Sequence, residues 1–202
     1  MEKNVTGLDE LFAGYAAGTL AAPAHALVGA HLELSGRNRK YVATLEDMGG
    51  LALEQTSPIS LSDRDAALAA ILDSDAPIVK PAQETAYDKR LPRSLSGIVG
   101  NSLETLPWKT LLPGVKECKF DEIDGCVPSV IWVRGGRAMP SHTHEGTELT
   151  LVLQGGFKDE EGHFVRGDLA FADDHIDHKP VADEGEDCIC FAVTEGSLRL
   201  TG

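Results

Sequence analysis

The chain of 202 residues carries 18 lysine and arginine residues against 32 aspartate and glutamate residues, for a formal net charge of −14. No run approaches the roughly 20 apolar residues of a membrane helix, and the first residues lack the basic head and apolar run of a secretory signal. The acidic balance argues against direct nucleic-acid binding and suits a basic protein partner. We therefore expect a cytoplasmic globular protein whose four cysteines are free thiols.

Apolar residues recur at helical spacing in three places within the first 75 residues. The three sets are Leu8, Leu11, Phe12 and Tyr15; Leu27, Val28, His31 and Leu32; and Tyr41, Leu45 and Met48. Gly49 and Gly50 weaken the third helix, and Ser62 to Asp65 resembles the cap and acidic first turn of a fourth. Residues 1–75 are thus predicted to form a bundle of three or four short helices. Its core is thin, so it needs a metal, a partner or the rest of the chain for full stability.

The residue pattern changes in the second half of the chain, from helical spacing to short strand-forming runs. Prolines at 77, 81 and 92 predict a linker over residues 76–96. From residue 97 onward, short runs of β-forming residues alternate with glycines, which predicts a sandwich or barrel over residues 97–202. The five clearest runs are Ser129–Val133, Glu148–Leu153, Asp168–Ala172, Cys188–Val193 and Ser197–Thr201. The expected fold class is α+β, with a small helical bundle followed by a β-barrel.

A cluster of metal-binding residue types stands in the second half. His142 and His144 are two residues apart on extended chain, so their side chains point to the same face. Glu148 can return to that face as the next strand begins. Two imidazoles and one carboxylate suit zinc, iron, manganese, nickel or copper. The alternative is that both histidines are exposed loop residues.

With Gly136 and Gly155 at its ends, this segment resembles the first motif of the cupin family, G-x5-H-x-H-x3-E-x6-G. The resemblance implies a double-stranded β-helix barrel with a metal inside. It also implies a further histidine from a second motif, for which His163, His175 and His178 are the candidates.

Gly167-Asp168 and Pro180 favour His178 as that further histidine, whereas His175 is expected on a turn or rim and His163 on a strand surface. The predicted ligands are therefore His142, His144, Glu148 and His178. We expect one metal in this site, zinc first, with iron, manganese or nickel as alternatives.

Cys188 and Cys190 lie two residues apart on a predicted strand, so they share a face. Parallel side chains at this spacing are poorly placed for a disulfide. They are expected to be small core residues, or else oxidisable thiols lining the barrel near the metal.

A helical bundle followed by a short cupin resembles the ChrR family of anti-sigma factors. The resemblance includes Tyr15 to Leu20, the helix carrying His31, and the cupin residues already named. It implies a cytoplasmic transcription regulator whose N-terminal helices sequester an extracytoplasmic-function sigma factor. The metal-bound cupin domain would sense an oxidant or small ligand. The alternatives are a cupin dioxygenase or isomerase acting on a small polar molecule, and a metal-stabilised homodimer.

One departure from the family pattern concerns the helical domain. The family places a zinc ion on an early histidine followed by H-x3-C-x2-C, whereas the corresponding residues here are Thr6, His31, Ser35 and Asn38. Structural zinc requires four nitrogen or sulfur ligands. We therefore expect His31 to be a packed or capped residue and the helices to fold without a metal of their own.

Overall fold

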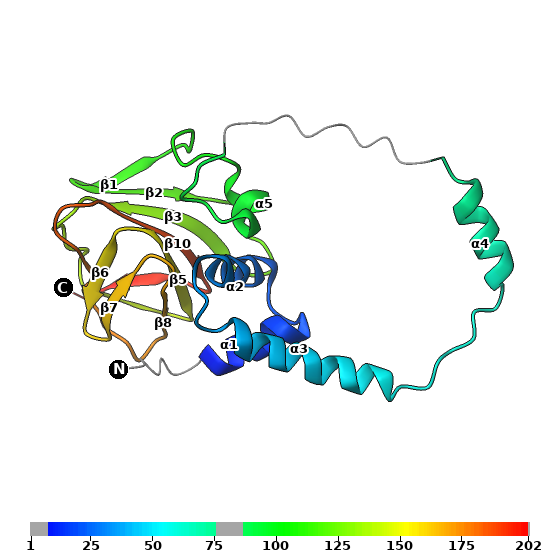
Figure 1. Ribbon diagram of the computed structural model, residues 1–202. Coiled ribbons are helices and arrows are strands. Elements are labelled where there is room, and N and C mark those ends of the chain that lie inside the picture. Colours follow the sequence, from blue (N-terminus) through cyan, green and yellow to red (C-terminus); the bar gives the residue numbers. More distant parts are fainter. Residues whose placement is uncertain (1–7, 76–86, 202) are drawn as a thin grey trace.

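The computed structural model describes residues 8–75 and 87–201 and has the predicted α+β order (Figure 1). The helices are α1 (Leu8–Ala17), α2 (Ala22–Leu34), α3 (Arg39–Glu54) and α4 (Arg64–Asp73), then a 3-10 turn η1 (Arg93–Leu95) and α5 (Ser96–Val99). The strands are β1 (Lys109–Leu112), β2 (Val115–Lys119), β3 (Val127–Val133), β4 (His142–His144), β5 (Glu148–Gln154), β6 (Gly156–Asp159), β7 (Gly162–Val165), β8 (Leu169–Ala172), β9 (Val181–Ala182), β10 (Cys188–Thr194) and β11 (Leu198–Leu200). All five predicted strands are present.

The predicted domain boundaries stay a prediction. Residues 76–86 of the predicted linker, like Thr6, lie outside the described residues. From residue 87 on, the chain already packs against the rest of the protein, since Leu91 and Leu95 are buried.

The strands form three antiparallel sheets that wrap into a barrel. The largest runs in the order β1-β2-β3-β10-β5-β8, and two smaller sheets, β11-β4 and β7-β6-β9, complete the wall. Side chains alternate strictly along β5, as the period of two requires. Leu149, Leu151 and Leu153 belong to one hydrophobic core, and Val152 belongs to another.

The two cores lie on opposite faces of the six-stranded sheet. The inner core fills the barrel with residues that include Val115, Phe157, Phe164 and Cys188. The outer core joins the sheet to the helices, where Leu27 and Val28 of α2 are fully buried together with Phe191 of β10. The expected support for the thin bundle therefore comes from the chain itself, because α2 lies against the outer face of β5 and β10.

Among the described helices, none by itself has the length and apolar character to cross a membrane. Only α1 and α2 taken together pass such a test, and they meet at an angle of 103°. The buried face of α2 is already used in the outer core.

The bundle comprises α1, α2 and α3, and α4 stands apart from it (Figure 1). Helix α3 runs through Gly49 and Gly50 to Glu54, so the glycines do not end it. Its second half leaves Met48, Leu51 and Leu53 exposed. Helix α4 begins after Asp63, whose carboxylate caps the Ala66 N–H at 3.4 Å, and it buries none of its residues.

Candidate metal centre

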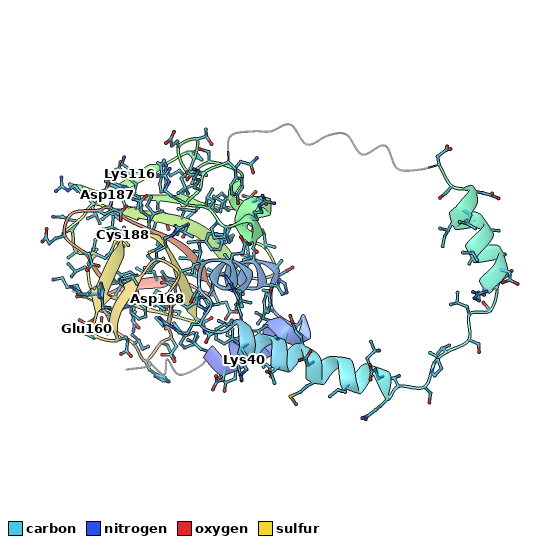
Figure 2. All side chains as sticks on the ribbon, in the orientation of Figure 1. Lys40, Lys116, Glu160, Asp168, Asp187 and Cys188 are labelled. Carbon is cyan, nitrogen blue, oxygen red and sulfur yellow. The ribbon has the colours of Figure 1, made fainter. Side chains whose placement is uncertain are left out.

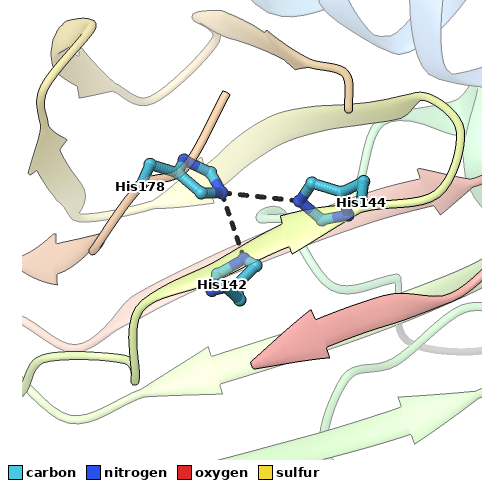
Figure 3. A group of neighbouring side chains, drawn as sticks. All are labelled: His142, His144 and His178. Atoms are coloured by element: carbon cyan, nitrogen blue, oxygen red, sulfur yellow. Dashed lines mark hydrogen bonds between the residues drawn. The ribbon is translucent and has the colours of Figure 1, made fainter. Parts of the chain in front are cut away.

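Three histidines meet inside the barrel (Figure 3). His142 and His144 lie at the two ends of β4, and alternation turns both rings to one side. Between them, the Thr143 hydroxyl turns to the carbonyl of Asp174 at 3.5 Å. His178 comes from the segment before β9 and exchanges two backbone hydrogen bonds of 3.1 Å with His142, so the pairing of the two segments brings the third ring into place.

The ring nitrogens converge on one point. The Nε2 atom of His178 lies 3.0 Å from Nε2 of His142 and 3.5 Å from Nε2 of His144. All three residues are buried: His142 is 4% exposed, His144 3% and His178 8%. The prediction that His142 and His144 share a face is confirmed, and their alternative as exposed loop residues is wrong.

Glu148 stands at the start of β5 on the side of His144. One carboxylate oxygen, Oε2, lies 3.0 Å from Nε2 of His144. The other, Oε1, accepts a hydrogen bond from the hydroxyl of Thr150 at 2.7 Å. This bond fixes the carboxylate at the edge of the histidine group.

Hydrogen bonds made by the Nδ1 atoms determine which ring nitrogens carry no hydrogen. Nδ1 of His142 donates to the carbonyl of Pro140 at 2.9 Å, and Nδ1 of His178 donates to the carboxylate of Asp159 at 3.0 Å. Both partners can only accept, so each Nδ1 carries the hydrogen and each neutral ring presents a bare Nε2 lone pair. Two lone pairs 3.0 Å apart repel unless a cation lies between them. The donor set therefore fits a divalent metal ion.

The surroundings shift the pKa values of His144 and His178 in opposite directions. Burial lowers the pKa of His144. Burial also opposes the charged form of His178, but the hydrogen bond to Asp159 and the nearby carboxylates of Glu148, Asp159 and Glu160 outweigh it and raise the pKa of His178. Positive charge is therefore favoured at His178 and disfavoured at His144.

A cavity of about 80 Å³ opens beside the histidines. Its wall is mostly apolar and includes Met139, Phe157 and Phe164. Cys188 and Cys190 line it from β10, with their sulfur atoms 3.6 Å apart (Cys188 is labelled in Figure 2). All four cysteines are free thiols, as predicted, and the burial expected for Cys188 and Cys190 extends to Cys118 and Cys126. The contact with Cys188 and burial hold the pKa of Cys190 well above its ordinary value, which disfavours a thiolate.

The two other histidine candidates lie elsewhere. His163 is on β7, where its ring is 2.6 Å from the Asp183 carboxylate at the surface. The side chain of His175 is 86% exposed. Their expected positions on a strand surface and at a turn or rim agree with the structure.

The glycines at the ends of the motif are required by the backbone. Gly136 and Gly155 have φ angles of +73° and +66°, which side chains rarely adopt. A Cβ atom on Gly155 would also lie 2.7 Å from the carbonyl oxygen of Asp187. These glycines let the strands turn sharply on either side of the histidine group.

Asp159 belongs to the site although its residue pattern did not predict it. Its Oδ1 accepts from the backbone N–H groups of Glu161 and Gly162, and its Oδ2 holds His178. The spacing of Asp159 and Gly162 could have indicated a tight turn. Nothing in the sequence connects it to a histidine 19 residues away.

Comparison with known proteins agrees with this architecture. The sequence profile described as "ChrR Cupin-like domain" matches residues 98–198. Over 193 residues, the chain is 40% identical to the anti-sigma-E factor ChrR of Cereibacter sphaeroides, covering 95% of this chain and 90% of the relative.

The chain belongs to the ChrR family of anti-sigma factors. A solved complex of Rhodobacter sphaeroides SigE with the anti-sigma ChrR is similar to it, with a TM-score of 0.79 and 39% identity. The similarity covers 93% of this chain and 96% of that one. Membership of the ChrR family favours a transcription regulator with a metal site over a cupin metalloenzyme.

Proposed function

We propose that this chain sequesters a sigma factor by covering it with α3 and α4. The observation that carries the proposal is the apolar surface that these helices leave exposed among the residues that the structure describes. On α4, Ile71 and Leu72 are 69% and 74% exposed. On α3, the exposed apolar residues are Tyr41, Met48, Leu51 and Leu53.

Such a surface is costly in water and indicates a binding partner. The side chains of α4 project from a helix that stands clear of the bundle and barrel (Figures 1 and 2). A second protein can therefore be gripped between α4 and the exposed half of α3. A net charge of −14 favours a basic partner through electrostatic complementarity. Because a sigma factor acts on RNA polymerase, we expect this protein in the cytoplasm.

We also propose that His142, His144, Glu148 and His178 hold one zinc ion. Three imidazoles and one carboxylate supply four ligands of the types that zinc prefers. Bound there, the metal would join β4, β5 and the segment before β9, which belong to different parts of the barrel wall. Iron, manganese and nickel accept the same ligands, so the metal content of the protein purified from its own cells decides the identity.

The sigma partner is tested by affinity capture. Full-length protein is used as bait in native cytosol under reducing conditions, and captured proteins are identified by mass spectrometry. Recovery of one extracytoplasmic-function sigma factor is expected. Capture without any sigma factor would overturn the proposed function, and a homodimer would then be sought by light scattering.

The His144→Ala variant should lower the metal content of the purified protein several-fold, because it removes one of the four proposed ligands, the imidazole that lies 3.0 Å from Glu148. Metal content is measured by plasma mass spectrometry against protein concentration. The matched control is His31→Ala, which also removes a buried histidine and should leave metal content unchanged. An unchanged stoichiometry in His144→Ala would mean that the ligand set is wrong.

A further inference from the structure

A buried histidine of α2 links the helices to the barrel through hydrogen bonds. His31, near the end of α2, is 3% exposed, and its Nδ1 lies 2.7 Å from the carbonyl oxygen of Gly167 in the turn between β7 and β8. A carbonyl only accepts, so Nδ1 carries the hydrogen. The other nitrogen, Nε2, then accepts from the Nδ2 amide of Asn38 at 3.1 Å. Both ring nitrogens are used, and neither is left for a metal.

His31 and its two partners belong to three different parts of the fold. Asn38 is the residue just before α3, so its amide ties the start of α3 to the end of α2. Gly167 belongs to the barrel, 136 positions from His31. One imidazole therefore joins α2, α3 and the barrel, which is the cross-linking role that a bound metal could otherwise fill.

Neighbouring polar contacts support the same junction. Arg37 pairs with Asp168 in the same turn at 3.3 Å. Arg39 donates from Nε to the carbonyl of Leu32 at 2.6 Å and from Nη2 to that of Glu33 at 3.0 Å, which caps the end of α2. Arg37 is exposed, so its ion pair contributes little energy by itself.

On its other side, the turn is bonded to the strands of the metal cavity. The Gly167 N–H donates to the carbonyl of Val152 at 2.9 Å, and the Val152 N–H donates to the carbonyl of Asp168 at 3.2 Å. Val152 is on β5, the strand that begins with Glu148. Strand β8 follows the turn and supplies Ala170 to the cavity wall. Backbone hydrogen bonds thus run from the strands at the metal centre to the carbonyl that holds His31.

We propose that His31 and Asn38 are positioning residues that replace a metal cross-link in the helical domain and transmit the metal state of the barrel to α2 and α3. In this arrangement, loosening of β5 or β8 shifts the Gly167 carbonyl and releases the hydrogen bonds that orient α3. The part of this inference that concerns sigma release rests on the proposed function. The coupling between barrel and helices does not.

The test is amide hydrogen exchange of the full-length protein, read by mass spectrometry, after loading with zinc chloride and after removal of zinc by a chelator. In the wild type, chelation should speed exchange in α2 and α3 peptides at least about fivefold, the lower end of ordinary coupling free energies. In His31→Phe and Asn38→Ala, this metal dependence should vanish, while β5 and β10 peptides keep theirs. No metal dependence in the wild type, or persistence of it in His31→Phe, would overturn the inference.

Two further variants separate positioning from general damage to the helices. His25→Phe changes another histidine of α2, one that stacks on Tyr15 at 4.4 Å, and should retain the metal dependence. Asn38→Asp should also retain it, because a charged His31 can donate to Gly167 and to the introduced carboxylate. Loss of the coupling in both variants would mean that any disturbance of the bundle abolishes it. Since sigma factor is absent from the experiment, failure of sigma capture leaves this result unaffected.

A pH dependence follows from the same contacts. Burial lowers the pKa of His31 below its ordinary value of 6.5, with the Gly167 carbonyl and Asp168 opposing and Arg37 adding to the shift. The unfolded chain therefore binds the proton more readily, so the contribution of His31 to stability is present above pH 6.5 and is lost as the pH falls below it. The stability advantage of the wild type over His31→Phe, measured by urea unfolding, should shrink between pH 7.5 and 5.5. An advantage that grows on acidification would contradict the neutral, doubly bonded ring.

Discussion

Replacing both Ile71 and Leu72 with aspartate is expected to weaken binding to the captured sigma factor by about 100-fold or more. The two side chains are exposed in the free chain, so the change costs little before binding. In the complex, each would bury an apolar side chain worth about 1.5–3 kcal/mol. The carboxylate of an aspartate at either position would instead lose its hydration on binding without gaining an ionic or hydrogen-bond partner. Binding is measured by titration calorimetry with the purified sigma factor.

The matched control introduces the same two charges nearby. Ser57→Asp with Ser60→Asp changes two exposed residues in the segment before α4 and adds equal negative charge. This control should keep the affinity within a few-fold. Equal losses in the two double variants would mean that charge, rather than the apolar face of α4, governs binding. Wild-type affinity in the Ile71 and Leu72 variant would remove α4 from the proposed interface.

Replacing His178 with alanine should destabilise the barrel even when no metal is bound. The side chain of Asp159 is 2% exposed, and one of its oxygens has His178 as its hydrogen-bond partner. The substitution leaves a buried carboxylate oxygen unpaired, at a cost of about 2–3 kcal/mol. Urea unfolding of chelator-treated protein measures the loss through the fluorescence of Trp108 and Trp132, both of which belong to the barrel half of the chain.

The double variant His178→Ala with Asp159→Asn isolates the cause. It removes the charge whose burial is penalised, so it should recover part of the stability lost in His178→Ala. Asp159→Asn alone still offers a carbonyl oxygen to Nδ1 of His178 and should cost less. If the double variant is no more stable than His178→Ala, the loss comes from the missing imidazole volume and not from the unpaired carboxylate.

The barrel and the helices are stabilised by different kinds of interaction. A metal bound on His142 and its neighbours would hold the barrel, whereas side-chain hydrogen bonds from His31 hold the helices. Beside the outer core under α2, the turn from Val165 to Asp168 belongs to the junction between them, with strands on one side and helix ends on the other. A change in the barrel therefore has a short physical route to the surface that would grip the partner.

Local pattern was sufficient to predict most of the regular structure. Helical spacing indicated α1 and α2, and β-forming runs between glycines indicated β3, β5, β8, β10 and β11. His142 and His144 could be placed on one face because alternation along a strand is fixed by backbone geometry. Each of these inferences depends on residues close together in the chain, where local conformation decides position.

Contacts between segments far apart in the chain became visible only in the folded protein. The sequence favoured His178 among three candidates, but only its pairing with β4 showed that it lies beside His142. Asp159 and Pro140 were not predicted as partners of the histidines, because hydrogen bonds across a barrel leave no periodic signal in sequence. The isolation of α4 was also not predicted, since helix propensity does not tell whether an apolar face meets its own chain or another.

The order of helices and barrel, the histidine pair on β4 and the absence of cysteine at Ser35 and Asn38 could all be read from the residues alone. The tertiary structure decided what His31 does instead of binding metal, because its partners are a carbonyl 136 positions away and an amide in the next helix. A substitution can show from sequence alone that a ligand is missing. Only the packed fold shows which hydrogen bonds take its place, since these depend on where the chain returns in space.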